Sequence, residues 1–82
     1  MADPVEWTKA YNAVRSAITA TQAAYDKKDT TSLKSENGKL SGAEKNLHLV
    51  QREEGTPETK ARTDDIKKEA KALLEKARLL TD

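Results

Sequence analysis

The sequence predicts an all-α fold, an antiparallel up-down-up three-helix bundle that forms one domain over residues 1–82. Three apolar stripes at helical spacing indicate the helices. Two clusters of turn and capping residues, at 27–31 and 55–57, indicate that the chain reverses direction twice. No segment shows the signals of a strand, so we expect no sheet.

The first helix is predicted over residues 4–26. Asp3, Pro4 and Glu6 fit an N-cap, a first helical position and the reaching-back residue of a capping box. Trp7 is the largest apolar residue of the stripe, and we expect it to close one end of the core. The stripe comprises Trp7, Tyr11, Val14, Ile18, Thr21 and Tyr25, with Ala10, Ala17 and Ala24 beside it.

The second helix is predicted over residues 31–54, opened by Thr30 or Thr31. Its apolar positions keep a heptad spacing, but two glycines interrupt them, and each interior glycine costs about 1 kcal/mol relative to alanine. Two interpretations follow: two shorter helices, or one helix whose glycines let a neighbour pack closely. The heptad leucines are Leu33, Leu40 and Leu47, and the interruptions are Asn37, Gly38 and Gly42.

The third helix is predicted over residues 57–80. Gly55 fits the end of one helix, Thr56 an N-cap, and Pro57 a first helical position, so the chain turns there. The stripe that follows is uninterrupted and comprises Thr59, Thr63, Ile66, Ala70, Leu73, Ala77 and Leu80.

The composition argues against nucleic-acid binding, metal binding and catalysis. With 15 Lys and Arg against 14 Asp and Glu the net charge is +1, which gives no strong field to attract nucleic acid. There is no cysteine and one histidine, His48, so we expect no metal site, no cofactor and no catalytic centre. No apolar run reaches the roughly 20 residues that span a bilayer. We therefore expect a soluble, cytoplasmic, non-enzymatic protein.

The groove between the second and third helices is the predicted binding surface for a partner helix. Small residues, Gly38 and Gly42 among them, are expected to keep this groove shallow. The candidate partner-binding residues are Leu49 and Leu74 as apolar anchors, with Lys67, Lys71 and Arg78 at the rim. The alternative is that the two leucines complete the core. The pair Asp64-Asp65 is interpreted as a solvated helix face, since calcium loops need more ligands.

Two stretches, EWTKAYNAVRSAI and LSGAEKNLHLVQREEGTPETKARTDDIKKEAKALL, resemble the N-terminal domains of Qc-type SNARE proteins. The similar proteins are the plant vacuolar and prevacuolar syntaxins and their animal syntaxin-eight-like relatives. The resemblance covers nearly the whole chain. The residues that carry it are Trp7, Tyr11 and Asn12, then Leu47-His48-Leu49-Val50, Pro57, Arg62, Asp64 and Ile66.

The resemblance implies a regulatory domain on the cytosolic face of endosomal, Golgi or vacuolar membranes. Its expected partners are proteins: a SNARE helix, a tether, a Sec1-family protein or an adaptor. The chain departs from a SNARE motif, because Gly55-Thr56-Pro57 breaks the only comparable heptad run. The alternative function is a free-standing helical adaptor or chaperone-like protein that completes a thin core by dimerising.

Overall fold

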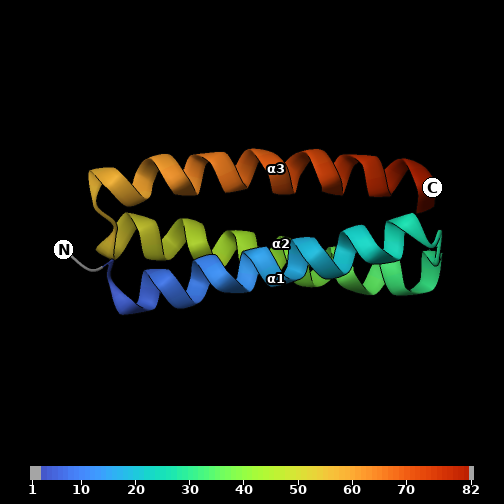
Figure 1. Ribbon diagram of the computed structural model, residues 1–82, viewed down its shortest axis with the longest axis horizontal. Coiled ribbons are helices and arrows are strands. Elements are labelled where there is room, and N and C mark those ends of the chain that lie inside the picture. The colour runs from blue at the N-terminus through green and yellow to red at the C-terminus, as the bar shows by residue number, and fades with distance from the viewer. Residues whose placement is uncertain (1–2, 82) are drawn as a thin grey trace.

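The computed structural model describes residues 3–81, which form three helices packed side by side. They are α1 (Val5–Asp26), α2 (Thr30–Glu54) and α3 (Pro57–Thr81). Figure 1 shows α1 and α3 running in one direction and α2 in the other, with the two ends of the chain at opposite ends of a rod of 41 × 17 × 17 Å. The predicted fold class is confirmed; residues 1, 2 and 82 of the predicted domain lie outside the described part.

The start of α1 differs from the predicted capping box. Pro4 occupies the N-cap position and makes no side-chain capping hydrogen bond. The carboxylate of Asp3 instead accepts a hydrogen bond from Arg62 on α3, at 2.7 Å from Nη1 to Oδ2. A tertiary ion pair has therefore replaced a local cap, which sequence-local reasoning does not detect.

The connection between α1 and α2 is closed by a left-handed residue that is not glycine. Lys28 has φ of 55°, and its N–H donates to the carbonyl of Tyr25 at 3.0 Å. The N–H of Asp29 donates to the carbonyl of Ala24 at 3.1 Å. This pair of bonds is the Schellman pattern, in which glycine is the usual residue at the left-handed position.

Asp29 then caps α2. Its carboxylate accepts from the backbone N–H of Ser32 at 3.1 Å and from the Ser32 hydroxyl at 2.8 Å. These two bonds favour the ionised form, so they hold the pKa of Asp29 below its ordinary value. Thr30 is the first residue of α2. It is one of the two residues, Thr30 and Thr31, that were predicted to open this helix.

The second helix is continuous through both interior glycines, which resolves the choice left open by its sequence. Gly38 and Gly42 are exposed, and a Cβ added at either would meet nothing within 4 Å. No described neighbour packs closely against them. The helix is held instead by Leu33, Leu40 and Leu47, whose side chains are completely buried.

The second turn follows the predicted stop and start. Gly55 ends α2 in an extended conformation, with φ of −72° and ψ of 158°, and Pro57 opens α3. Thr56 and Thr59 cap α3 reciprocally: each side-chain oxygen accepts from the other residue's N–H, at 2.8 and 3.2 Å. The arrangement is a capping box with threonine in place of the usual acidic residue.

The core runs the length of the bundle in two clusters. Trp7 lies in the larger one with 1% of its surface exposed, so the prediction that it is a core residue is confirmed. The predicted stripe of α3 is buried from Thr59 to Ala77. The larger cluster holds Trp7, Ala10, Val14, Leu40, Leu47, Ile66, Ala70 and Leu73; the smaller holds Ala24, Leu33 and Ala77.

Candidate functional site

A polar network joins all three helices at the end of the bundle that carries the second turn. The indole N–H of Trp7 donates to Thr63 Oγ1 at 2.8 Å. The hydroxyls of Thr63 and Thr59 reach Gln51 Oε1 at 3.1 and 2.8 Å, and Gln51 Nε2 donates to the carbonyl of Thr56 at 3.3 Å. Because Trp7 and both threonines are buried, these bonds satisfy groups that would otherwise lose water without compensation.

Beside this network the α2–α3 groove widens into a hollow of about 270 Å³, which we call the His48 pocket. Lys67 Nζ lies 3.0 Å from His48 Nδ1 at its rim. Since an ammonium only donates, Nδ1 is the acceptor in a hydrogen bond of this geometry. Lys60 is paired with Asp64 at 3.1 Å. The lining residues are His48, Gln51, Arg52, Lys60, Thr63, Asp64 and Lys67.

Four of the five predicted partner-binding residues share one face of α3. Lys67, Lys71, Leu74 and Arg78 recur at steps of four, three and four, which places them in one row on a helix. Leu74 is half-buried and packs against the larger core cluster, whereas Lys71 and Arg78 are exposed. Among the ion pairs of residues 3–81, none involves the three cations of this row.

Leu49 lies apart from that row. It is on α2 with half of its surface exposed, and it does not line the His48 pocket. The small residues Thr63, Ala70 and Ala77 of α3 are buried, and Thr63 also lines the His48 pocket. The His48 pocket of the α2–α3 groove has basic side chains at its rim and a polar floor.

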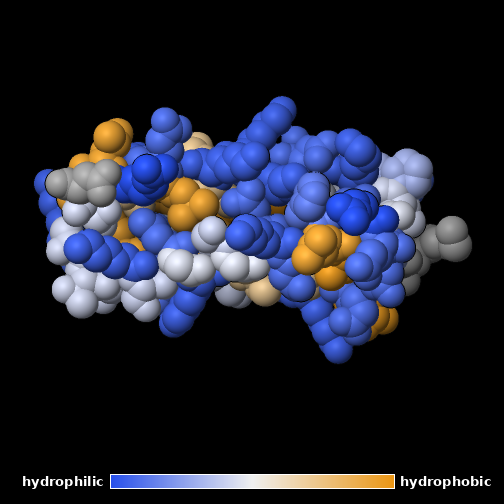
Figure 2. Space-filling model, turned by 180° about the vertical axis from the view of Figure 1, so that it is seen from behind, coloured by the Kyte–Doolittle hydropathy of each residue, from blue (hydrophilic) through white to orange (hydrophobic). Residues whose placement is uncertain are grey.

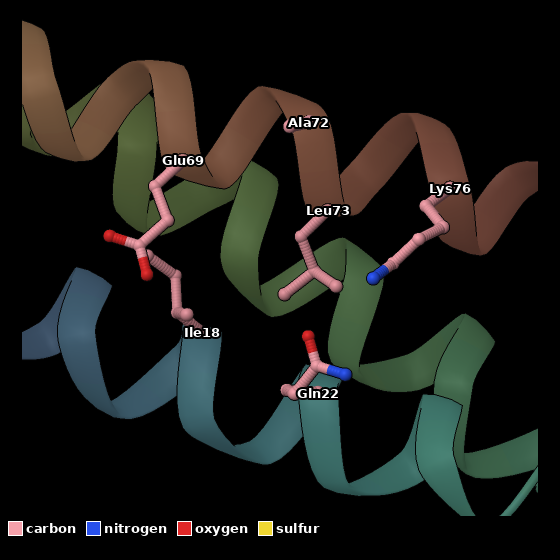
Figure 3. A pocket seen from close by; sticks show the side chains of 6 residues that line it. All are labelled: Ile18, Gln22, Glu69, Ala72, Leu73 and Lys76. Carbon is pink, nitrogen blue, oxygen red and sulfur yellow. The ribbon is translucent and has the colours of Figure 1, made fainter.

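A second groove runs between α1 and α3, and Figure 3 shows its side chains. Ile18 and Leu73 approach each other from the two helices, and Glu69, Lys76 and Gln22 extend along the opening. Leu73 is only 5% exposed, so the prediction that it is a core residue is confirmed. The apolar floor of this groove is small, and the polar side chains of Gln22, Glu69 and Lys76 border it.

Arg62 fastens α3 to the start of α1. Its guanidinium carbon lies 4.7 Å from the ring centroid of Trp7 and 5.0 Å from that of Tyr11, while Nη1 bonds Asp3. The two rings are stacked at 4.8 Å. The hydrogen bond to Asp3 raises the pKa of Arg62 above its already high ordinary value, so the group stays charged. Arg62 itself occupies the space over the two aromatic rings, so this cluster holds α3 against α1 and does not receive a ligand.

The outer surface carries no broad apolar face on the side seen in Figure 2, where hydrophilic residues surround a few separate hydrophobic patches. The large hydrophobic side chains exposed in the described chain are Val5, Leu49 and Leu79. Between residues 3 and 81, no three or more His, Cys, Asp or Glu side chains gather as metal ligands. None of the three described helices is long and apolar enough to cross a membrane.

Comparisons with protein-family profiles, with curated proteins and with solved structures each found no match. The interpretation of the site therefore depends on the chain's own geometry.

The sequence analysis did not predict that His48 and Arg52 line a pocket with residues of α3, although the sequence contains a signal for it. Only Gly55 and Thr56 separate α2 from α3, so residues at similar distances on either side of this turn must lie opposite each other. That rule places Arg52 near Lys60 and His48 near Asp64, and Lys67 follows Asp64 by one helical turn. The predicted row on α3 contained Lys67, but periodicity within α3 alone says nothing about which residue of α2 that lysine contacts.

Proposed function

We propose that this chain is a non-enzymatic protein-interaction domain that binds an acidic amphipathic helix of a partner along the α2–α3 groove. The observation that carries the proposal is the α3 row. Lys67, Lys71 and Arg78 are cations with no carboxylate partner among the described residues, and they surround the half-buried Leu74. An apolar position flanked by unpaired charge of one sign favours a helix of the opposite sign.

The resemblance to Qc-type SNARE N-terminal domains supports a regulatory role in endosomal, Golgi or vacuolar vesicle trafficking. Within that role the partner is a SNARE helix, a tether, a Sec1-family protein or an adaptor. A helix of this kind would cover Leu74 and add apolar burial to a bundle whose helix seams are rich in alanine and threonine. The cations would guide its approach and fix its orientation.

The test is a titration of isotope-labelled chain with a Qc-type SNARE helix, followed by NMR. We expect shifts concentrated on α2 and α3. The double change Lys71→Glu and Arg78→Glu should weaken binding at least tenfold, since both side chains are exposed and their reversal leaves the core intact. Lys68→Glu, an exposed lysine outside the row, is the matched control and should change affinity little.

Leu74→Glu tests the apolar anchor and Leu79→Glu, at a position 79% exposed, controls for added charge on α3. Thermal melts of each variant separate lost folding from lost binding. Shifts confined to α1, or equal loss in the row and control variants, would contradict the groove. Sedimentation equilibrium tests the alternative: a concentration-dependent dimer that these changes abolish would make a second copy the occupant.

A further inference from the structure

We propose that the His48 pocket is an oxyanion site that receives an acidic side chain of a partner protein, and that it binds more tightly when His48 is protonated. The inference extends the proposed function, because Lys67 belongs both to the pocket and to the α3 row. It adds a specific anchoring position and a dependence on pH.

The charges around the pocket are unbalanced. Arg52, Lys60 and Lys67 are permanent cations, and Asp64 is the one carboxylate among the lining residues. Asp64 is engaged by Lys60, while Arg52 and Lys67 have no ion-pair partner between residues 3 and 81. Two donors with full charge therefore face a hollow with space for an added group, and an oxyanion would accept hydrogen bonds from both.

The floor of the pocket is held in place before any ligand arrives. Gln51 and Thr63 line it, and both are fixed by the network that includes Trp7. A preformed floor lowers the cost of ordering the site when a ligand binds. The cations at the rim are carried by two different helices, so an anion between them would also link α2 to α3.

His48 makes the site sensitive to pH. Its Nδ1 lies within hydrogen-bond distance of Lys67, and the charged groups facing it across the groove on α3 are Lys60, Asp64 and Lys67. On α2 itself Arg52 lines the pocket, and Glu44 and Lys45 lie one turn before His48; no α1 residue lines the described pocket. Protonation removes the acceptor and places two cations 3.0 Å apart. A bound oxyanion accepts from both and relieves the repulsion, so proton and anion favour each other's binding.

An acidic protein segment is favoured over a membrane as the source of the oxyanion. The cations continue from the pocket along α3 as a single row through Lys71 to Arg78, which matches a linear partner. Asp64 lies in the pocket and Glu75 is exposed next to Leu74, and both would oppose a flat anionic surface. Charge complementarity therefore fits a segment whose acidic residues can avoid these two carboxylates.

The test uses sulfate, which keeps its double charge at both pH values compared below. His48 is the one histidine of the chain, so its ring C–H signals in NMR report on the pocket alone. At constant ionic strength, sulfate should shift these signals where chloride does not. Binding should tighten from pH 7.5 to 5.5, by up to about thirtyfold on full protonation, the effect in water of one added unit charge about 4 Å from a doubly charged anion.

Adjacent residues supply matched controls. Lys67→Gln should weaken sulfate binding several-fold and Lys68→Gln should not, because only Lys67 lines the pocket. Asp64→Asn should strengthen binding, with Asp65→Asn neutral. His48→Gln should retain the affinity seen at pH 7.5 and abolish the tightening at pH 5.5. The proposed site would be contradicted if Lys67→Gln and Lys68→Gln changed sulfate affinity equally, or if Asp64→Asn and Asp65→Asn did. It would also be contradicted if sulfate affinity still depended on pH in His48→Gln.

The occupant is tested by competition. A glutamate-rich helical peptide should displace sulfate in a Lys67-dependent manner; displacement by vesicles rich in phosphatidylserine but not by the peptide would overturn the acidic segment. If a SNARE helix binds the groove but sulfate leaves His48 unshifted, this inference fails and the proposed function stands. If sulfate binds as expected but no helix does, the proposed function fails and the oxyanion site stands.

Discussion

Replacing Gly38 and Gly42 by alanine should stabilise the protein, because α2 continues through both positions into open space. A Cβ at either residue meets nothing within 4 Å, so the change creates no clash and buries no polar group. An interior glycine is about 0.8–1.0 kcal/mol less favourable than alanine in a helix. The double variant should therefore gain about 1.6–2.0 kcal/mol, provided that the two sites add.

Replacing Gly55 by alanine should destabilise the protein, in contrast to the same change at Gly38 and Gly42. A Cβ there would collide with the side-chain amide and the carbonyl of Gln51. That amide cannot move freely, since it bonds Thr56, Thr59 and Thr63. The backbone at Gly55 has φ of −72°, which alanine adopts without strain, so the cost comes from crowding alone. Such overpacking costs about 1–3 kcal/mol.

Urea and thermal unfolding followed by circular dichroism measure both effects. For a domain of this size, 1 kcal/mol shifts the melting temperature by about 4–8 °C, so the double variant should melt about 6–16 °C higher. Gly55→Ala should melt lower. A double variant that is less stable than the parent would refute the continuity of α2 through Gly38 and Gly42. If Gly55→Ala leaves stability unchanged, the hydrogen-bonded side chain of Gln51 can move aside at little cost.

Three further predictions concern the caps and the buried network. Thr63→Val should cost about 1–3 kcal/mol in urea unfolding by leaving the buried Trp7 N–H without a partner, and a double-mutant cycle with Trp7→Phe should show coupling. Lys28→Gly should be neutral or stabilising by up to about 1 kcal/mol, since Lys28 is left-handed, whereas Lys27→Gly should destabilise. The lowered pKa of Asp29 means that its capping contribution is present above the ordinary pKa near 4 and is lost as pH falls through the lower folded value. In Asp29→Asn, the free energy of unfolding should therefore fall less as the pH is lowered below about 4. If it falls as much as in the parent protein, other carboxylates cause the loss of stability in acid.

The helices could be predicted to within a residue because their ends are encoded locally. Thr56 and Pro57 fit an N-cap and a first helical position, and the structure uses them in those roles. The same local reasoning failed at Asp3, whose carboxylate pairs with Arg62, 59 residues away in the chain. It also missed the left-handed Lys28, because the residue type at that position is not the usual glycine.

The core could be predicted from periodicity, but the side on which each flanking residue lies could not. On α1 the fully buried line passes through Ala10 and Ala24, while Tyr11 and Tyr25 are only half-buried. The period of a stripe does not say which of two adjacent stripe residues faces the centre of the core. The two tyrosines instead border α3, where Arg62 and Lys76 lie over their rings at 5.0 and 4.7 Å.

Polar contacts are distributed unequally along the α2–α3 seam, and this asymmetry bears on how a partner would bind. At the turn end, Gln51 is satisfied by threonines of α3. Asn37 lies two heptads earlier on the same side of α2, and its buried Oδ1 has no hydrogen-bond partner in the described chain. An unsatisfied acceptor weakens this end of the seam relative to the other. If a partner helix binds as proposed, its contacts at the His48 pocket would lie beside hydrogen-bonded side chains, and those toward Arg78 would lie nearer the unsatisfied Asn37.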